Sequence, residues 1–251
     1  KYICWIKHCG DDACFTVLQA DRFLGPYEVV KTHYRPFNHE VGDFDITVCS
    51  DTAYLYMDAD HSGLLTMRLT TDFTEAAEKI CWQYKNLHAP FCREAPAVFS
   101  HEGKWFMLTS GMTGYVPNRS DSAAANSPDA PFLSIGNPHV EDDSCASFNS
   151  QISQVFKVPS KRGLYIALAD RWVPDYPVDA KLADLLERCT AQRFDPKHYK
   201  ATPEEMQHMM QSPMLSSANT SRADYVWLPI TFENGKPKIH WCDSWKLSEF
   251  E

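Results

Sequence analysis

The 251-residue chain contains no run of about 18 apolar residues, the length that a membrane-spanning helix needs. Positive charge is also scarce: 24 Lys+Arg stand against 33 Asp+Glu, which gives a formal net charge of −9. This deficit disfavours a nucleic acid or an anionic membrane as a partner. The chain is nevertheless 44% apolar and 13% aromatic, which is enough for the core of a globular protein and excludes extensive disorder.

The usual signatures of metal and nucleophile chemistry are missing as well. No two of the nine cysteines form C-x-x-C, and the ten histidines form no H-E-x-x-H, so no zinc site is predicted. The absence of G-x-S-x-G and of a glycine-rich phosphate loop disfavours a serine hydrolase and a nucleotide-binding enzyme. We expect no cofactor, although a structural cation stays open. An odd number of cysteines indicates reduced thiols and favours the cytoplasm over secretion.

Four short segments that alternate aromatic or β-branched with polar residues resemble one another. Their leading aromatic residues stand at intervals of 52, 51 and 60 residues: Tyr2, Tyr54, Trp105 and Tyr165. A recurring unit of about 50 residues that holds several short strands is typical of a β-propeller blade. Further strand signals fill the units at 64–69, 132–135, 225–232 and 238–245. The sequence therefore predicts an all-β propeller.

A second strand precedes the aromatic segment in three of the four units. Each of these strands begins with a polar residue and continues into apolar ones, over 45–48, 94–99 and 151–156. The first strand of a propeller blade lines the central channel, so we expect Asp45, Glu94 and Gln151 to converge at one mouth of it. No such strand precedes Tyr2. The chain is therefore expected to begin at the second strand of a blade and to be an N-terminally truncated piece, because an open arc leaves strand edges exposed.

Between residues 178 and 221 the apolar spacing changes to that of helices. Leu182, Leu185 and Cys189 recur at helical intervals, and Thr202-Pro203-Glu204-Glu205 offers an N-cap, a proline in the first turn and a capping glutamate. We predict a helical insertion between two strands of the last blade. The whole chain, 1–251, is then one partial propeller domain with this insertion on its side.

The segments 93–99 and 103–118 resemble a five-bladed glycoside hydrolase of family 43, in the group that includes exo-β-1,3-galactanases and related β-galactosidases. Shorter matches occur at Gly25-Pro26-Tyr27, Gly42-Asp43-Phe44-Asp45, Phe148-Asn149-Ser150-Gln151, Asp170-Arg171-Trp172, 225–230 and 241–245. The resemblance covers almost the whole chain outside the helical insertion. It implies a five-bladed propeller, here without its first blade and one further strand.

The resemblance implies an inverting, exo-acting hydrolase that releases galactose from β-galactan side chains of a plant-type polysaccharide. Inversion needs a protonated carboxylic acid on one face of the sugar and a base on the other, about 6.5–9.5 Å apart, so that a water fits between them. By the resemblance Glu94 is the general acid, and its apolar neighbours would raise its pKa. Asp45 matches the carboxylate that orients the acid and tunes its pKa.

The resemblance assigns three further side chains. Gln151 falls on the position of the base, but a neutral amide is a poor base, so we expect it to position the water. Thr113 matches a substrate-contacting threonine, and Trp172 could stack on a sugar ring. These candidate site residues also have a structural explanation. Asp45, Thr113 and Gln151 could be turn or hydrogen-bonding residues, and Trp172 could belong to the core.

Two other functions stay open. Within the family, an α-L-arabinofuranosidase or a β-xylosidase uses the same acid on another sugar. A propeller that binds glycans without cleaving them is the alternative outside the enzymes, and the presence of both Glu94 and Asp45 favours the enzyme. Because a missing first blade would carry part of the pocket, we expect the chain as written to be weakly active or inactive.

Overall fold

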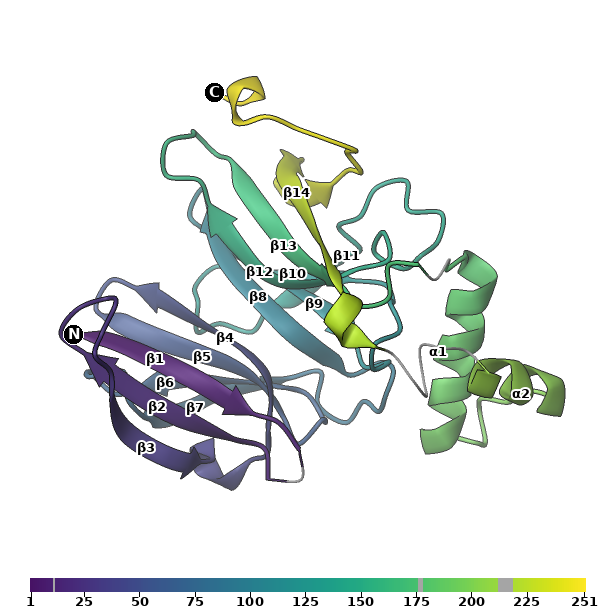
Figure 1. The fold of residues 1–251 in the computed structure, drawn as a ribbon, viewed down its shortest axis with the longest axis horizontal. Helices are drawn as coiled ribbons and strands as arrows, with labels where there is room; N and C mark the ends of the chain where they lie inside the picture. The colour runs from purple at the N-terminus through teal and green to yellow at the C-terminus, as the bar shows by residue number, and fades with distance from the viewer. Residues whose placement is uncertain (11, 176–177, 212–218) are drawn as a thin grey trace.

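A computed structural model describes residues 1–10, 12–175, 178–211 and 219–251. In these residues the chain forms four antiparallel sheets, and each sheet takes its strands in chain order (Figure 1). The first sheet holds β1 (Tyr2–His8), β2 (Cys14–Ala20) and β3 (Glu28–Tyr34). The second holds β4 (Val41–Cys49), β5 (Thr52–Ala59), β6 (Leu64–Leu69) and β7 (Ala76–Gln83).

The third sheet holds β8 (Arg93–His101), β9 (Lys104–Gly111), β10 (Asp121–Ala125) and β11 (Leu133–Gly136). The fourth holds β12 (Gln151–Lys157), β13 (Tyr165–Arg171), β14 (Asp224–Glu233) and β15 (Lys236–Ile239). Short 3₁₀ turns stand at η1 (Pro36–Asn38), η2 (Thr220–Arg222) and η3 (Leu247–Glu249). No helix in the described part of the chain is long and apolar enough to cross a bilayer.

The repeat seen in the sequence is a repeat of strands. The four aromatic segments are β1, β5, β9 and β13, and the three polar-led segments are β4, β8 and β12, each the first strand of its sheet. In the first sheet β1 is an edge strand, whereas β5, β9 and β13 are each second. The all-β fold is thus confirmed. The four described sheets do not close into a ring (Figure 1), so the number of blades stays a prediction.

The core lies between neighbouring sheets. Leu55 and Met57 on β5 pack toward the first sheet around Phe15, while Tyr54 and Tyr56 on the same strand pack toward the third sheet around Met107. Successive residues of a strand point to opposite faces, so β5 is buried on both. This explains why its sequence is almost continuously apolar.

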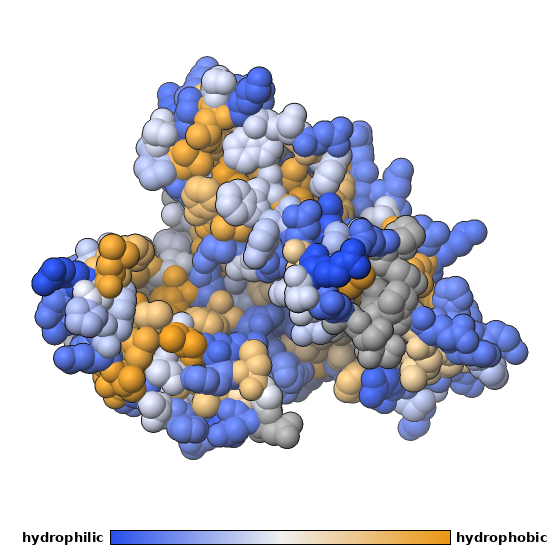
Figure 2. Space-filling model, in the orientation of Figure 1, coloured by the Kyte–Doolittle hydropathy of each residue, from blue (hydrophilic) through white to orange (hydrophobic). Residues whose placement is uncertain are grey.

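Parts of the outer faces of the first and last sheets remain exposed. Apolar side chains on these strands lie in solvent, among them Tyr2, Ile6, Val29, Tyr225 and Trp227. Figure 2 shows apolar residues on the lobe of the first sheet and on the lobe of the fourth, with a hollow between the two lobes. Within the described residues, no other sheet packs against either of these faces.

A buried carboxylate joins the three inner strands. β8 lies between β4 and β12. Asp45 on β4, 4% exposed, accepts a hydrogen bond from the Val98 backbone N–H on β8 at 2.7 Å and from Gln154 Nε2 on β12 at 3.0 Å. Burial raises the pKa of Asp45, although these hydrogen bonds act the other way. One side chain therefore accepts from a buried donor of the third sheet and from a partly buried donor of the fourth.

Two helices, α1 (Ala180–Phe194) and α2 (Pro203–Gln211), stand between β13 and β14, the interval of the predicted insertion. Residues 212–218 of that insertion lie outside the described residues. The predicted capping box is present, because Thr202 Oγ1 accepts from the Glu205 N–H and Glu205 Oε2 accepts from the Thr202 N–H. The helices pack their buried Leu186, Cys189 and Met209 against Val116 in the loop after β9.

The predicted last strand, 238–245, is shorter in the structure and ends at Ile239. The residues beyond it make other contacts: Trp241 Nε1 donates to Asp243, and Trp245 Nε1 donates to the Trp227 carbonyl at 2.7 Å. The Trp245 indole thus holds an irregular tail against β14. Trp245 and Phe250 pack there on the cluster that contains Ile166.

Replacing Asp45 by alanine tests the role of the buried carboxylate. Asp45→Ala leaves the Val98 N–H and the Gln154 amide without their acceptor, and each unsatisfied buried group costs about 1–3 kcal/mol. We expect the free energy of unfolding in guanidinium chloride to fall by about 2–4 kcal/mol. The control is Asp51→Ala at the exposed turn after β4, which should change stability by less than about 0.5 kcal/mol. Equal stability of the two variants would contradict the assignment.

Candidate active site

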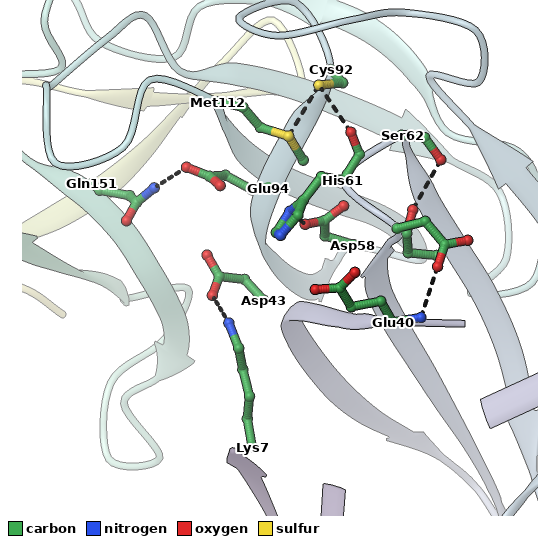
Figure 3. A network of polar contacts seen from close by, with 12 residues as sticks. Lys7, Glu40, Asp43, Asp58, His61, Ser62, Cys92, Glu94, Met112 and Gln151 are labelled. Carbon is green, nitrogen blue, oxygen red and sulfur yellow. Dashed lines mark hydrogen bonds and ion pairs between the residues drawn. The ribbon is translucent and has the colours of Figure 1, made fainter. Parts of the chain in front are cut away.

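Irregular pairing shapes the same end of all three inner strands. The register shifts between Val41 and Phe44 in β4, between Glu94 and Ala97 in β8, and between Ile152 and Gln154 in β12. In β8, Ala95 takes a left-handed conformation with φ 49°, which is strained for alanine. Bulges of this kind redirect side chains away from strict alternation. Asp43, Glu94 and Gln151 consequently face one common space (Figure 3).

Glu94 is the most strongly perturbed acid of this space. Burial raises its pKa from an ordinary 4.5 to about 8, and the negative charges of Asp43 and Asp58 act in the same direction. A hydrogen bond from Gln151 and the charge of His61 lower it by smaller amounts. The carboxyl is therefore protonated at neutral pH. This is the state that a general acid requires.

Gln151 is fixed at both ends of its amide. Its Nε2 donates to Glu94 Oε1 at 3.2 Å and to Ser110 Oγ at 2.7 Å, and its Oε1 accepts from Trp172 Nε1 at 3.3 Å. The structure thus brings three of the predicted residues, Glu94, Gln151 and Trp172, into one chain of hydrogen bonds. Gln151 lies directly beside the acid, and its part in positioning water stays a prediction.

Asp45 and Asp43 occupy different surroundings. The Asp45 carboxylate is bonded to Val98 and Gln154, whereas Asp43 has Oδ1 at 2.9 Å from Lys7 Nζ and is one of the charges that raise the pKa of Glu94. The pKa-tuning role of Asp45 stays a prediction, but the geometry favours Asp43 for it. Sequence reasoning passed over Asp43. The signal was its place at the start of β4, which matches that of Glu94 at the start of β8.

A second acidic group, also missed from the sequence, lies under the start of β4. Asp58 on β5 is fully buried and its Oδ2 is 2.6 Å from His61 Nδ1. A Cβ on Gly42 would stand 2.1 Å from Asp58 Oδ2, so only glycine fits at that position of the bulge. Nothing in the spacing of Asp58 and His61 marks them as part of a site.

Thr113 holds the loop that follows β9. Its Oγ1 donates to the Val116 carbonyl at 2.6 Å and accepts from Asn118 Nδ2 at 2.7 Å, and the side chain is 7% exposed. Asn118 also bonds the backbone N–H and carbonyl of Gly111. The hydroxyl is thus engaged inside the loop, and the predicted substrate contact of Thr113 stays a prediction.

The same loop forms one wall of a small pocket over Gln151. Tyr115, which sequence reasoning missed, lines this pocket with Trp172, and their ring centroids are 5.5 Å apart. Tyr115 is 47% exposed, so its ring offers a flat apolar face to solvent. The helical insertion supports the loop from behind through Val116 and through an ion pair of Arg119 with Asp184 at 3.2 Å.

Comparison with known proteins identifies the fold. No protein-family model and no curated protein sequence matches the chain. Solved structures do: a β-1,3-galactosidase of glycoside hydrolase family 43 shares 26% identity over 94% of this chain and 40% of its own, with a TM-score of 0.70.

Two exo-β-1,3-galactanases share the fold at lower identity. The enzyme from Phanerochaete chrysosporium, solved with β-1,3-galactotriose, is 19% identical over 95% of this chain and 45% of its own, with a TM-score of 0.67. The enzyme from Clostridium thermocellum is 17% identical over the same shares, with a TM-score of 0.62. The predicted resemblance to family 43 galactanases and galactosidases is therefore confirmed. The chain spans less than half the length of each of these three proteins.

The raised pKa of Glu94 predicts a pH-dependent contribution to stability. A carboxyl whose pKa is about 8 in the folded state and near 4.5 in the unfolded state binds more protons when the protein is folded. The folded protein is therefore destabilised relative to the unfolded chain as the pH rises from 4.5 through 8. Glu94→Gln removes this penalty. We expect the variant to melt at a higher temperature than the parent at pH 9, and at a similar temperature at pH 4.5. Calorimetry at both values checks this, and the reverse pH trend would contradict the buried acid.

Proposed function

We propose that the chain carries the catalytic site of an inverting, exo-acting glycoside hydrolase that releases galactose from β-1,3-galactan side chains, on a five-bladed propeller. The observation that carries the proposal is Glu94: a carboxyl that stays protonated to about pH 8 at the place where three inner strands begin. The named activities of the structurally similar proteins, exo-β-1,3-galactanases and a β-1,3-galactosidase, support the choice of substrate.

In this proposal Glu94 gives its proton to the leaving glycosidic oxygen as the bond to the sugar breaks. Gln151 holds the acid in place through the 3.2 Å hydrogen bond. The negative charge of Asp43 disfavours the ionised form of Glu94 and so helps to keep it protonated. A water attacks the anomeric carbon from the opposite face of the ring, and the proton that it releases passes to solvent, from which Glu94 is protonated again. Trp172 and Tyr115 offer flat faces against the C–H surface of galactose.

Hydrolysis and the role of the acid are tested together. We would follow sugar release from β-1,3-galactan and from arabinan by NMR, with the natural chain that contains residues 1–251. We expect α-galactose from the galactan, and a loss of about 10²–10⁴-fold in Glu94→Gln, the usual contribution of a general acid. Glu102→Gln, on the exposed turn after β8, is the control and should keep full activity.

Other products would redirect the assignment. Arabinose release would move the substrate to that of an arabinofuranosidase and leave the acid in place. No release from either polymer, with glycan binding intact, would overturn the catalytic proposal and leave a glycan-binding propeller.

The pH profile distinguishes the two candidate tuning residues. Activity should fall as pH rises through about 8, because Glu94 then loses its proton. Asp43→Asn removes a negative charge and leaves Lys7 unpaired, so the pKa of Glu94 falls. The alkaline limb of the activity profile therefore moves to lower pH. Asp45→Asn should leave the limb where it is. A limb that moves in Asp45→Asn but not in Asp43→Asn would restore the prediction from the sequence.

A further inference from the structure

A histidine on the tight turn between β5 and β6 pairs with an aspartate near the end of β5. His61 Nδ1 stands 2.6 Å from Oδ2 of the fully buried Asp58, while the His61 side chain itself is 59% exposed. Figure 3 shows the His61 ring between Asp58 and the space that Glu94 and Asp43 face. Asp58 thus anchors the pair in the core, while the His61 ring is open to the site.

The turn that carries His61 is held in place on both sides. His61 has a left-handed backbone, φ 49°, and its carbonyl accepts a hydrogen bond from Cys92 Sγ at 3.7 Å. Cys92 stands two residues before Glu94 and also contacts Met112 Sδ at 3.0 Å. A Cβ on Gly63 would lie 2.6 Å from the Gln83 carbonyl, so the turn packs closely on β7 as well. The imidazole is therefore pre-positioned relative to the acid.

The hydrogen bond to Asp58 decides which ring atom serves the site. With Nδ1–H donated to the carboxylate, Nε2 is the atom left for a ligand. The Asp58 hydrogen bond raises the pKa of His61, burial opposes it, and the negative charges of Asp58 and Glu40 add to the rise. As an imidazolium, His61 donates from Nε2, and as a neutral ring it accepts there. A sugar hydroxyl, both donor and acceptor, satisfies either form.

We propose that His61 is a further substrate-binding residue, whose Nε2 binds a hydroxyl of the terminal galactose that Glu94 cleaves from its chain, and that Asp58 is its positioning residue. The inference rests on the proposed function for its substrate. Three observations carry it: the exposed ring on a fixed turn, its anchorage on a fully buried carboxylate, and its place beside the general acid.

The first test measures binding without turnover. Galactose is titrated by calorimetry into Glu94→Gln and into Glu94→Gln combined with His61→Ala, and we expect the second to bind at least tenfold more weakly. The matched control is His198→Ala in the same background, because His198 is also an exposed histidine paired with an aspartate three residues away, Asp195, at 2.7 Å. It should bind as Glu94→Gln does. Equal affinity of the His61 variant, or no binding of galactose to Glu94→Gln, would overturn the inference.

The second test separates positioning from a purely structural role. Asp58→Asn keeps an oxygen that accepts from His61 Nδ1–H, whereas Asp58→Ala removes it. We expect Asp58→Asn to retain galactose affinity within about threefold, and Asp58→Ala to lose as much as His61→Ala, since a freed ring no longer presents Nε2. An equal loss in both Asp58 variants would contradict positioning. Thermal melting of each variant shows that the compared proteins are folded.

The two proposals fail in different ways. If Glu94→Gln retains its sugar release, the catalytic role of Glu94 fails while the titration still reports on His61. If Glu94→Gln is inactive and His61→Ala leaves KM and the galactose affinity unchanged, the proposed function stands and the role of His61 is wrong.

Discussion

The arrangement of the site depends on one buried carboxylate. Asp45 accepts hydrogen bonds from a backbone N–H of β8 and from a side chain of β12, so it fixes the two strands against β4 at a single point. Two residues before it Asp43 faces the site, and across the same contact Glu94 and Gln151 begin their own strands. Without Asp45, the buried Val98 N–H and the partly buried Gln154 amide would lose their acceptor. The group that holds the sheets together is thus distinct from the groups that would carry the chemistry.

The site holds two residues in states that they would not adopt in water or in a regular strand. Glu94 is placed where burial and two neighbouring carboxylates oppose its ionisation, and the following alanine adopts a left-handed conformation. Both features cost stability, and both keep a protonated carboxyl aimed at one space. The helical insertion adds support from outside, because Val116 anchors the loop of Thr113 and Tyr115 on α1 and α2. The insertion therefore supports the pocket, and none of its described residues lines it.

Most of the strands and two of the site residues could be predicted from the sequence. The spacing of aromatic residues predicted the strands β1, β5, β9 and β13, and the polar residue before each apolar run predicted that Glu94 and Gln151 lie together, as their hydrogen bond shows. The alternation of apolar and polar residues could not reveal how the bulges redirect side chains. In β4 the register shifts between Val41 and Phe44, which brings Asp43 to the site while Asp45 ties the strands together. Asp58 and His61 were invisible for another reason: their pairing depends on a turn that only the fold defines.

The most direct test of this account is the ionisation of Glu94 in the folded protein. Carbon-13 NMR of side-chain carboxyl groups, with Glu94→Gln used to assign the signal, follows that group through a pH titration. The account predicts a midpoint near 8 for Glu94. A midpoint near 4.5, the ordinary value of a glutamate, would show that the carboxyl is ionised at neutral pH and would contradict its role as the acid.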